Sequence, residues 1–177
     1  QQTLSGRSPA PVEKGFRTGA EPGVLLQFLV VSPAAAGSTP EVRRGVNHGT
    51  YRPDSWIMFR YELKEKAAVY IVRTGPEHEP EIVYPRDNGG RKPERPGVYD
   101  AAQKGELLLY NLEGLSGLQT FCAVTASGKD PDQDRILAQV QNALERNKKQ
   151  LHSNRLRSGQ MDCFQIKVEK RWQEEIP

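Results

Sequence analysis

The sequence predicts a mainly β protein: an antiparallel β-sandwich of about seven to eight strands with one long amphipathic helix near the C-terminus. The first observation is that every second side chain in residues 55–63 is apolar or aromatic: Ile57, Phe59, Tyr61 and Leu63. Successive side chains of a strand point to opposite faces, so these four share one face. Two further observations are the repetition of short apolar segments between turn residues, and a helical pattern that follows residue 130.

Eight strands are expected in chain order, at residues 24–31, 42–53, 55–63, 67–73, 81–84, 106–110, 118–126 and 163–172. The first is short, apolar and rich in β-branched residues between Gly23 and Pro33, which indicates a buried core strand. Residues 42–53 are expected to contain only a short strand that ends in a turn. Pro85 ends the strand at 81–84, because proline has no backbone N–H for a neighbouring strand.

The later strands depend on similar signals. Residues 86–96 are expected to form a loop, and residues 114–117 a turn into the strand at 118–126. That strand places Cys122 on the same face as Leu118 and Val124, so burial of Cys122 is expected. The terminal strand at 163–172 alternates apolar and polar side chains, which predicts that it is half-buried.

The helix is expected at residues 131–149. Asp130 can cap its first turn, Pro131 suits the first helical position, and Gln133 stands where a capping-box partner belongs. One stripe of the helix carries its apolar residues: Ile136, Val140, Ala143 and Leu144. This stripe predicts that the helix packs on its own domain, with packing on a partner as the alternative.

Length and charge restrict the class of protein. A chain of 177 residues suits one domain, expected at residues 24–177, and residues 1–23 are expected to form a flexible tail. The net charge of only +3 argues against a nucleic-acid partner. No run of about 18 apolar residues exists, so no direct membrane span is expected. The start at Gln1, without a methionine, is expected for a protein after signal peptide removal, although a trimmed chain looks the same.

Two cysteines, Cys122 and Cys163, leave two interpretations open. They form one disulfide in an oxidising compartment, or they are two buried, reduced thiols. A disulfide would close a loop of about 40 residues and stabilise the fold by roughly 4 kcal/mol. Neither cysteine has another cysteine or a histidine at metal-ligand spacing, so no metal site and no cofactor are expected.

No catalytic constellation is visible, and the chain is therefore expected not to be an enzyme. His48, Asp54 and Ser55 are close in the sequence, and a serine nucleophile needs a nearby base and acid, but proximity in sequence does not establish geometry. The three histidines are expected to be solvent-exposed. Residues 88–92 contain glycines and basic residues but lack the spacing of a phosphate-binding loop.

The residues expected to bind a partner are Trp56, Met58, Trp172, Lys148 and Lys149. Trp56 and Met58 lie on the strand face opposite Ile57, so they are expected at the surface unless a second layer covers them. With Arg155 and Arg157, the two lysines form a basic group near the helix end, a position where positive charge also complements the helix dipole.

Five segments together resemble a bacterial extracytoplasmic β-sandwich domain of unknown function that occurs in envelope proteins of myxobacteria and other proteobacteria. The segments are residues 51–55, 68–72, 81–85, 105–109 and 117–121. The resemblance extends over residues 42–170, with departures at Ser55 and Gln119. It implies a sandwich fold and an envelope location, and it brings no catalytic residues.

The function expected from this combination is a non-enzymatic periplasmic or cell-surface interaction module that binds an envelope protein or a cell-wall component. It would use the exposed side of the sheet or the helix. The main alternative is a small hydrolase or glycan-active enzyme with a site in the sheet-edge loops. A third interpretation is ligand binding in a cleft at the end of the sandwich, lined by tyrosines.

Overall fold

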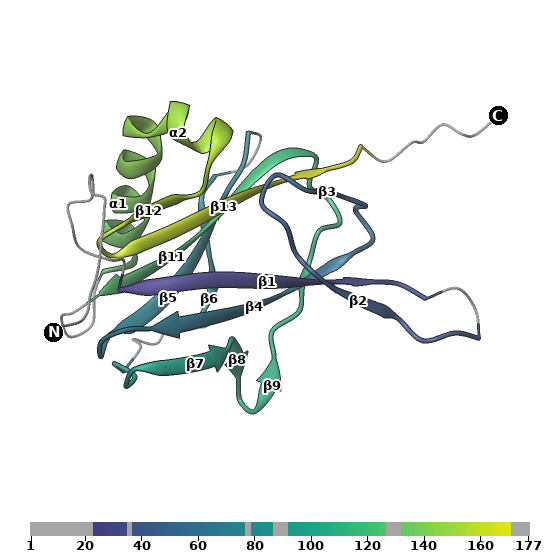
Figure 1. Cartoon of the computed structure of the whole chain (residues 1–177), viewed down its shortest axis with the longest axis horizontal. Helices are drawn as coiled ribbons and strands as arrows, with labels where there is room; N and C mark the ends of the chain where they lie inside the picture. The colour runs from purple at the N-terminus through teal and green to yellow at the C-terminus, as the bar shows by residue number, and fades with distance from the viewer. Residues whose placement is uncertain (1–22, 35–36, 77–78, 87–91, 127–131, 171–177) are drawn as a thin grey trace, which may run out of the picture.

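The computed structural model describes residues 23–34, 37–76, 79–86, 92–126 and 132–170. These residues form two packed β-sheets, with two helices against the outer surface of one of them (Figure 1). The predicted mainly β sandwich with a helix near the C-terminus is confirmed. Residues 1–22 of the predicted tail lie outside the described residues.

The first sheet, sheet A, has the strand order β10-β4-β1-β2, and β7 also pairs with β4. Its strands are β1 (Val24–Ser32), β2 (Glu41–Arg44), β4 (Trp56–Leu63), β7 (Gly97–Asp100) and β10 (Tyr110–Asn111). All the pairings are antiparallel. β1 pairs with β4 at residues 24–31 but with β2 only at residues 29–32. Among the residues that the structure describes, the first half of β1 therefore has one edge without a neighbouring strand, which we call the unpaired edge.

The second sheet, sheet B, has the order β12-β13-β11-β5-β6, and β3 pairs in parallel with β13. Its strands are β3 (Thr50–Tyr51), β5 (Ala68–Thr74), β6 (Glu81–Tyr84), β11 (Gly117–Ala126), β12 (Leu156–Ser158) and β13 (Met161–Val168). A separate pair is formed by β8 (Ala102–Gln103) and β9 (Glu106–Leu107).

The main core lies between the two sheets. The alternation predicted for residues 55–63 is observed, because Ile57, Phe59, Tyr61 and Leu63 are all buried in it. Stacked and tilted aromatic rings join the layers: Phe28 of β1 stacks on Phe164 of β13 with ring centroids 4.0 Å apart. Such aromatic pairs add to the hydrophobic burial that holds the sheets together.

A second core lies on the other side of sheet B, beneath helices α1 (Gln133–Arg146) and α2 (Lys148–Ser153). The apolar stripe of α1 buries Ile136, Val140 and Ala143 there, which confirms that the helix packs on its own domain. The predicted helix boundaries were wrong. Asp132 caps α1 by accepting a hydrogen bond from the N–H of Asp134, and the helix ends at Arg146, with Asn147 as its C-cap, instead of continuing to residue 149. Asp130 and Pro131, where the sequence placed the helix start, lie outside the described residues.

Several predicted strand boundaries were also wrong. Residues 42–53 contain two strands, β2 and β3, and residues 106–110 are divided between β9 and β10. β7 and β8 were missed, because their short sequences carry no strong alternating pattern. The terminal strand spans residues 161–168 rather than 163–172, and Trp172 lies outside the described residues.

Candidate binding surfaces

A cleft of about 790 Å³ lies between β6 of sheet B and the segment from β10 to residue 115. At its base the Arg73 side chain, which is only 3% exposed, donates from Nε to the Glu81 carboxylate at 2.8 Å. A second nitrogen of Arg73 donates to the side-chain oxygen of Gln119 at 2.9 Å. The buried guanidinium is therefore compensated by a carboxylate and an amide, as a buried charge requires.

Tyr110 extends this network, because its hydroxyl donates to the same Glu81 oxygen at 2.7 Å. Burial raises the pKa of Tyr110 above its ordinary range, and the hydrogen bond to Glu81 adds to the shift. Among the described residues that line the cleft are three carboxylates and two arginines, and none is a serine, cysteine or histidine. The cleft is therefore a polar surface of mixed charge, with one tyrosine rather than the several expected for a tyrosine-lined ligand site.

A group of apolar side chains lies at one end of the outer face of sheet A. Val42, Val31 and Trp56 are direct neighbours across β2, β1 and β4, and the next row holds Leu29 and Met58. We call these five residues the outer apolar patch. Val42 is 55% exposed, and the other four are partly exposed. The helices α1 and α2 cover sheet B, on the opposite side of the sandwich (Figure 1).

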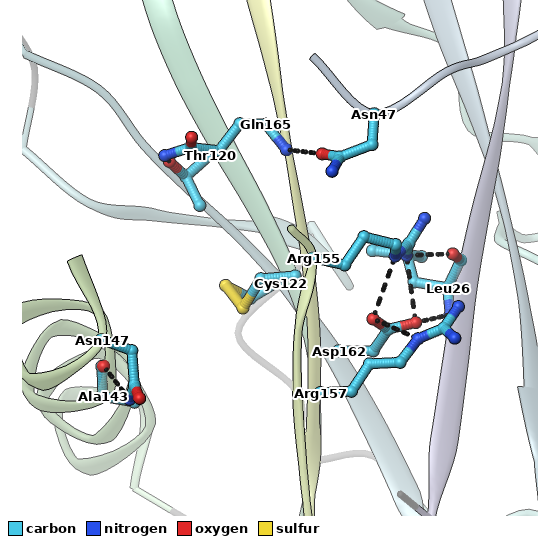
Figure 2. The surroundings of a disulfide bond; sticks show 11 residues. Leu26, Asn47, Thr120, Cys122, Ala143, Asn147, Arg155, Arg157, Asp162 and Gln165 are labelled. Atoms are coloured by element: carbon cyan, nitrogen blue, oxygen red, sulfur yellow. Dashed lines mark hydrogen bonds and ion pairs between the residues drawn. A yellow bond between two sulfur atoms is a disulfide. The ribbon is translucent and has the colours of Figure 1, made fainter. Parts of the chain in front are cut away.

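A buried carboxylate joins the two sheets at the unpaired edge of β1. The Asp162 side chain is 0% exposed and accepts hydrogen bonds from the backbone N–H of Leu26 at 2.7 Å and from Arg155 at 3.0 and 3.3 Å. The Nε of Arg157 donates to it at 3.2 Å. Arg155 also donates to the carbonyl oxygen of Leu26 at 2.6 Å. Figure 2 shows the two guanidiniums on either side of the carboxylate.

The two cysteines are bridged. Cys122 and Cys163 are directly opposite in β11 and β13, and both are fully buried in the core beneath the helices. This decides between the two interpretations that the sequence left open. The pairing depends on register, because only residues that face each other on neighbouring strands approach closely enough to bond.

The structure separates the predicted partner-binding residues. Trp56 and Met58 lie in the outer apolar patch, on the solvent-facing side of β4 as expected. Lys148 and Lys149 are exposed at the start of α2, which packs on sheet B. The Nζ of Lys148 lies 3.4 Å from a carboxylate oxygen of Glu145. The basic group that was expected near the helix end does not form one surface, because Arg155 and Arg157 turn toward Asp162.

The histidine, aspartate and serine that are close in sequence do not form a catalytic arrangement. His48 donates from Nε2 to the carbonyl oxygen of Leu151, since a carbonyl can only accept. The Asp54 carboxylate binds Arg52 through two hydrogen bonds at 2.7 and 3.1 Å. Ser55 is 2% exposed at the start of β4. Within the described part of the chain, no hydrogen bond joins His48, Asp54 and Ser55.

Sequence reasoning missed the two buried charges. A signal for Arg73 was present, because it is a single charge at the end of the apolar run 67–72. Asp162 offered a similar signal next to Cys163. A buried charge without a partner is very costly, so a charge inside a predicted core strand indicates a partner elsewhere in the fold.

Comparisons with protein-family models, with curated proteins and with solved structures found no match to this chain. Within the described ranges, no three histidine, cysteine, aspartate or glutamate side chains are grouped so that they could hold a metal ion. Neither described helix is long and apolar enough to cross a membrane.

Proposed function

We propose that this protein is a non-enzymatic interaction module that binds another protein through the outer apolar patch. The observation that carries the proposal is the position of Trp56, which lies partly exposed between Val31 and Asn111 on a sheet face that neither helix covers. Tryptophan is enriched among the residues that dominate binding energy at protein interfaces. A flat apolar surface with polar surroundings is typical of such interfaces.

The charge beside the patch restricts the partner. Arg44 is the neighbour of Leu29 in the second row of the patch, and it is exposed and has no ion pair within the described residues. An arginine next to an apolar centre favours a partner surface with the opposite charge at its rim. We therefore expect a partner protein whose apolar contact region has acidic side chains at its border.

The compartment proposed for this interaction is the periplasm or the extracellular space, as the resemblance to the envelope domain implies. The Cys122–Cys163 disulfide supports this location, because disulfides persist in oxidising compartments and are rare in the cytosol. An envelope protein is accordingly the partner we propose, and no nucleic acid is expected.

A photo-crosslinking residue at Met58 tests the proposal. It should capture one defined partner from an envelope extract, whereas the same residue at the exposed position Gln141 of α1 should not. The purified partner should then bind the wild-type protein directly, and Trp56→Ala should weaken binding at least about tenfold while Gln141→Ala leaves it unchanged. Equal binding by Trp56→Ala and the wild type would contradict the proposal.

The alternative function, a small hydrolase or glycan-active enzyme, is favoured by the carboxylates of the cleft beside β6. Glu79, Glu81 and Glu113 all line it, and glycoside hydrolysis requires a pair of carboxyl groups. If the alternative is correct, the protein turns over a glycan substrate and Glu81→Gln abolishes turnover. If the interaction module is correct, Glu81→Gln does not change partner binding.

A further inference from the structure

A second pocket, of about 230 Å³, lies beside the unpaired edge of β1 and is lined by arginines. We call it the arginine pocket, and its charged residues are Arg44 of β2, Arg60 of β4, Arg157 of β12, and Arg155 just before β12. Its remaining lining comes from residues 26–29 and Gly45. The described lining contains no aspartate or glutamate, so a ligand entering it meets guanidiniums and no carboxylate.

The positive charge of the pocket is only partly compensated by its surroundings. Arg155 and Arg157 share the single carboxylate of Asp162 behind them, and Arg60 binds Asp100 at 2.7 Å. Arg44 has no ion pair among the residues that the structure describes. Four guanidiniums and two neighbouring carboxylates leave an excess of two positive charges at the pocket.

Local contacts hold Arg155 and Arg157 in place before any ligand binds. Arg155 is fixed by Asp162, by the carbonyl oxygen of Leu26, and by the Phe164 ring, whose centre lies 5.6 Å from the guanidinium carbon. Arg157 uses only its Nε toward Asp162, so its two terminal NH₂ groups have no hydrogen-bond partner within the described part of the chain. An oxyanion could accept hydrogen bonds from them without breaking an existing one.

Gly45 explains how Arg44 is placed at the pocket. The N–H of Gly45 donates to the carbonyl oxygen of Phe28 at 2.8 Å, and a Cβ at this position would collide with the Phe28 ring. Only glycine permits this close approach of the chain to the ring. The residue before it, Arg44, is thereby brought over the edge of β1 near Arg155 and Arg157, which come from the far end of the chain.

From this arrangement we infer that the arginine pocket binds a phosphate group, either as inorganic phosphate or as part of a phosphate ester. Guanidiniums recognise phosphate and carboxylate oxygens through paired hydrogen bonds. The net charge of the ligand decides between phosphate and carboxylate. A phosphate ester carries a charge of about −1.5 to −2 at pH 7, which matches the excess of two positive charges at the pocket, whereas a carboxylate carries a single negative charge. The volume is below the range of about 300–1,000 Å³ typical of whole drug-sized ligands, so it suits one small anionic group.

This site is distinct in function from the outer apolar patch, although Leu29 borders both surfaces and Arg44 lies beside the patch. Phosphate binding requires no partner protein, so the two proposals can fail separately. A protein that binds phosphate but no partner through Trp56 retains the present inference and loses the proposed function. A protein that binds a partner through Trp56 but does not bind phosphate retains the proposed function and loses the present inference.

Isothermal titration of the whole chain with inorganic phosphate, glycerol 1-phosphate and acetate at constant ionic strength tests the inference. We expect saturable binding of phosphate or glycerol 1-phosphate with one site per chain, and binding of acetate at least about tenfold weaker. Stronger binding of glycerol 1-phosphate than of inorganic phosphate identifies an ester as the ligand. Stronger binding of inorganic phosphate identifies the free ion.

Two neighbouring arginines provide a matched pair of variants. Arg44→Ala should weaken phosphate binding about tenfold, and Arg43→Ala should leave it unchanged, because Arg43 is also exposed but pairs with Val30 and does not line the pocket. Arg157→Gln, which keeps most of the side chain, should also weaken binding. The inference is overturned if neither phosphate compound binds saturably, if acetate binds as tightly, or if Arg43→Ala weakens binding as much as Arg44→Ala.

Discussion

Replacement of Asp162 by asparagine should destabilise the fold far more than the same replacement at an exposed aspartate. Asparagine has nearly the same shape, so the change removes the charge and leaves no cavity. Asp162 is 0% exposed and accepts hydrogen bonds from Leu26, Arg155 and Arg157. Without it, two guanidiniums lose their common partner, and the edge of β1 loses a charge-assisted bond between the sheets.

The size of the effect follows from the burial of the partners. Removal of one member of a fully buried ion pair costs about 3–5 kcal/mol. Here the side chain of Arg155 is 22% exposed and that of Arg157 is 48% exposed, so both can be partly solvated after the change. We therefore expect a loss at the lower end, about 3 kcal/mol. Arg157→Ala should cost about 1 kcal/mol or less, because it removes one bond from a half-exposed side chain.

Urea unfolding followed by circular dichroism measures this loss. With a slope of about 2 kcal/mol per M, Asp162→Asn should lower the unfolding midpoint by roughly 1.5 M. Asp100→Asn is the matched control, because the Asp100 carboxylate also binds an arginine but its side chain is 39% exposed, so its loss should cost less than about 1 kcal/mol. Similar midpoints for Asp162→Asn and Asp100→Asn would refute the argument that burial makes the difference.

Two further predictions concern the disulfide and the buried tyrosines. Replacing both Cys122 and Cys163 by alanine should lower the free energy of unfolding by about 2–4 kcal/mol, because the bridge joins residues 41 apart and restricts the unfolded chain. The thermal unfolding of this variant should not depend on reductant, whereas that of the wild type should. Burial, aided by hydrogen bonds to carboxylates, raises the pKa of Tyr61 and Tyr110 in the folded state. These two phenols therefore contribute their full stabilisation below the unfolded-state pKa of about 10. The stabilisation is lost as the pH rises beyond that value, because the unfolded state then releases the phenol protons more readily than the folded state. Unfolding measured between pH 8 and 11 should show this decline, and Tyr61→Phe and Tyr110→Phe should each reduce its slope; an unchanged slope in both variants would contradict the role of these phenols.

The sheet faces could be predicted from the sequence because they depend on a local property. In β4, every second residue is apolar, and an error of one position would place all of these side chains in water. The same alternation predicts that Trp56 and Met58 lie on the outer face, where the structure has them. The apolar stripe of α1 likewise predicted the face that Ile136 and Val140 bury.

The candidate sites could not be predicted to the same extent, because each combines distant parts of the chain. Asp162 contacts Leu26, 136 residues earlier, and Arg73 of the cleft contacts Gln119, 46 residues later. Nothing in the sequence around any of these residues specifies its partner. The arginine pocket has the same origin, because Arg44 and Arg155 become neighbours only when β1 and β13 come together across the core.

The sequence alone determined the secondary structure that repeats every two or every 3.6 residues, and with it the faces that avoid water. Only the tertiary structure decided that Cys122 faces Cys163, that Asp162 closes the free edge of β1, and that arginines from separate strands share one pocket. The physical reason is that burial acts on each segment through its own side-chain pattern, whereas disulfide and charge pairing depend on the register and packing of strands that are remote in the chain.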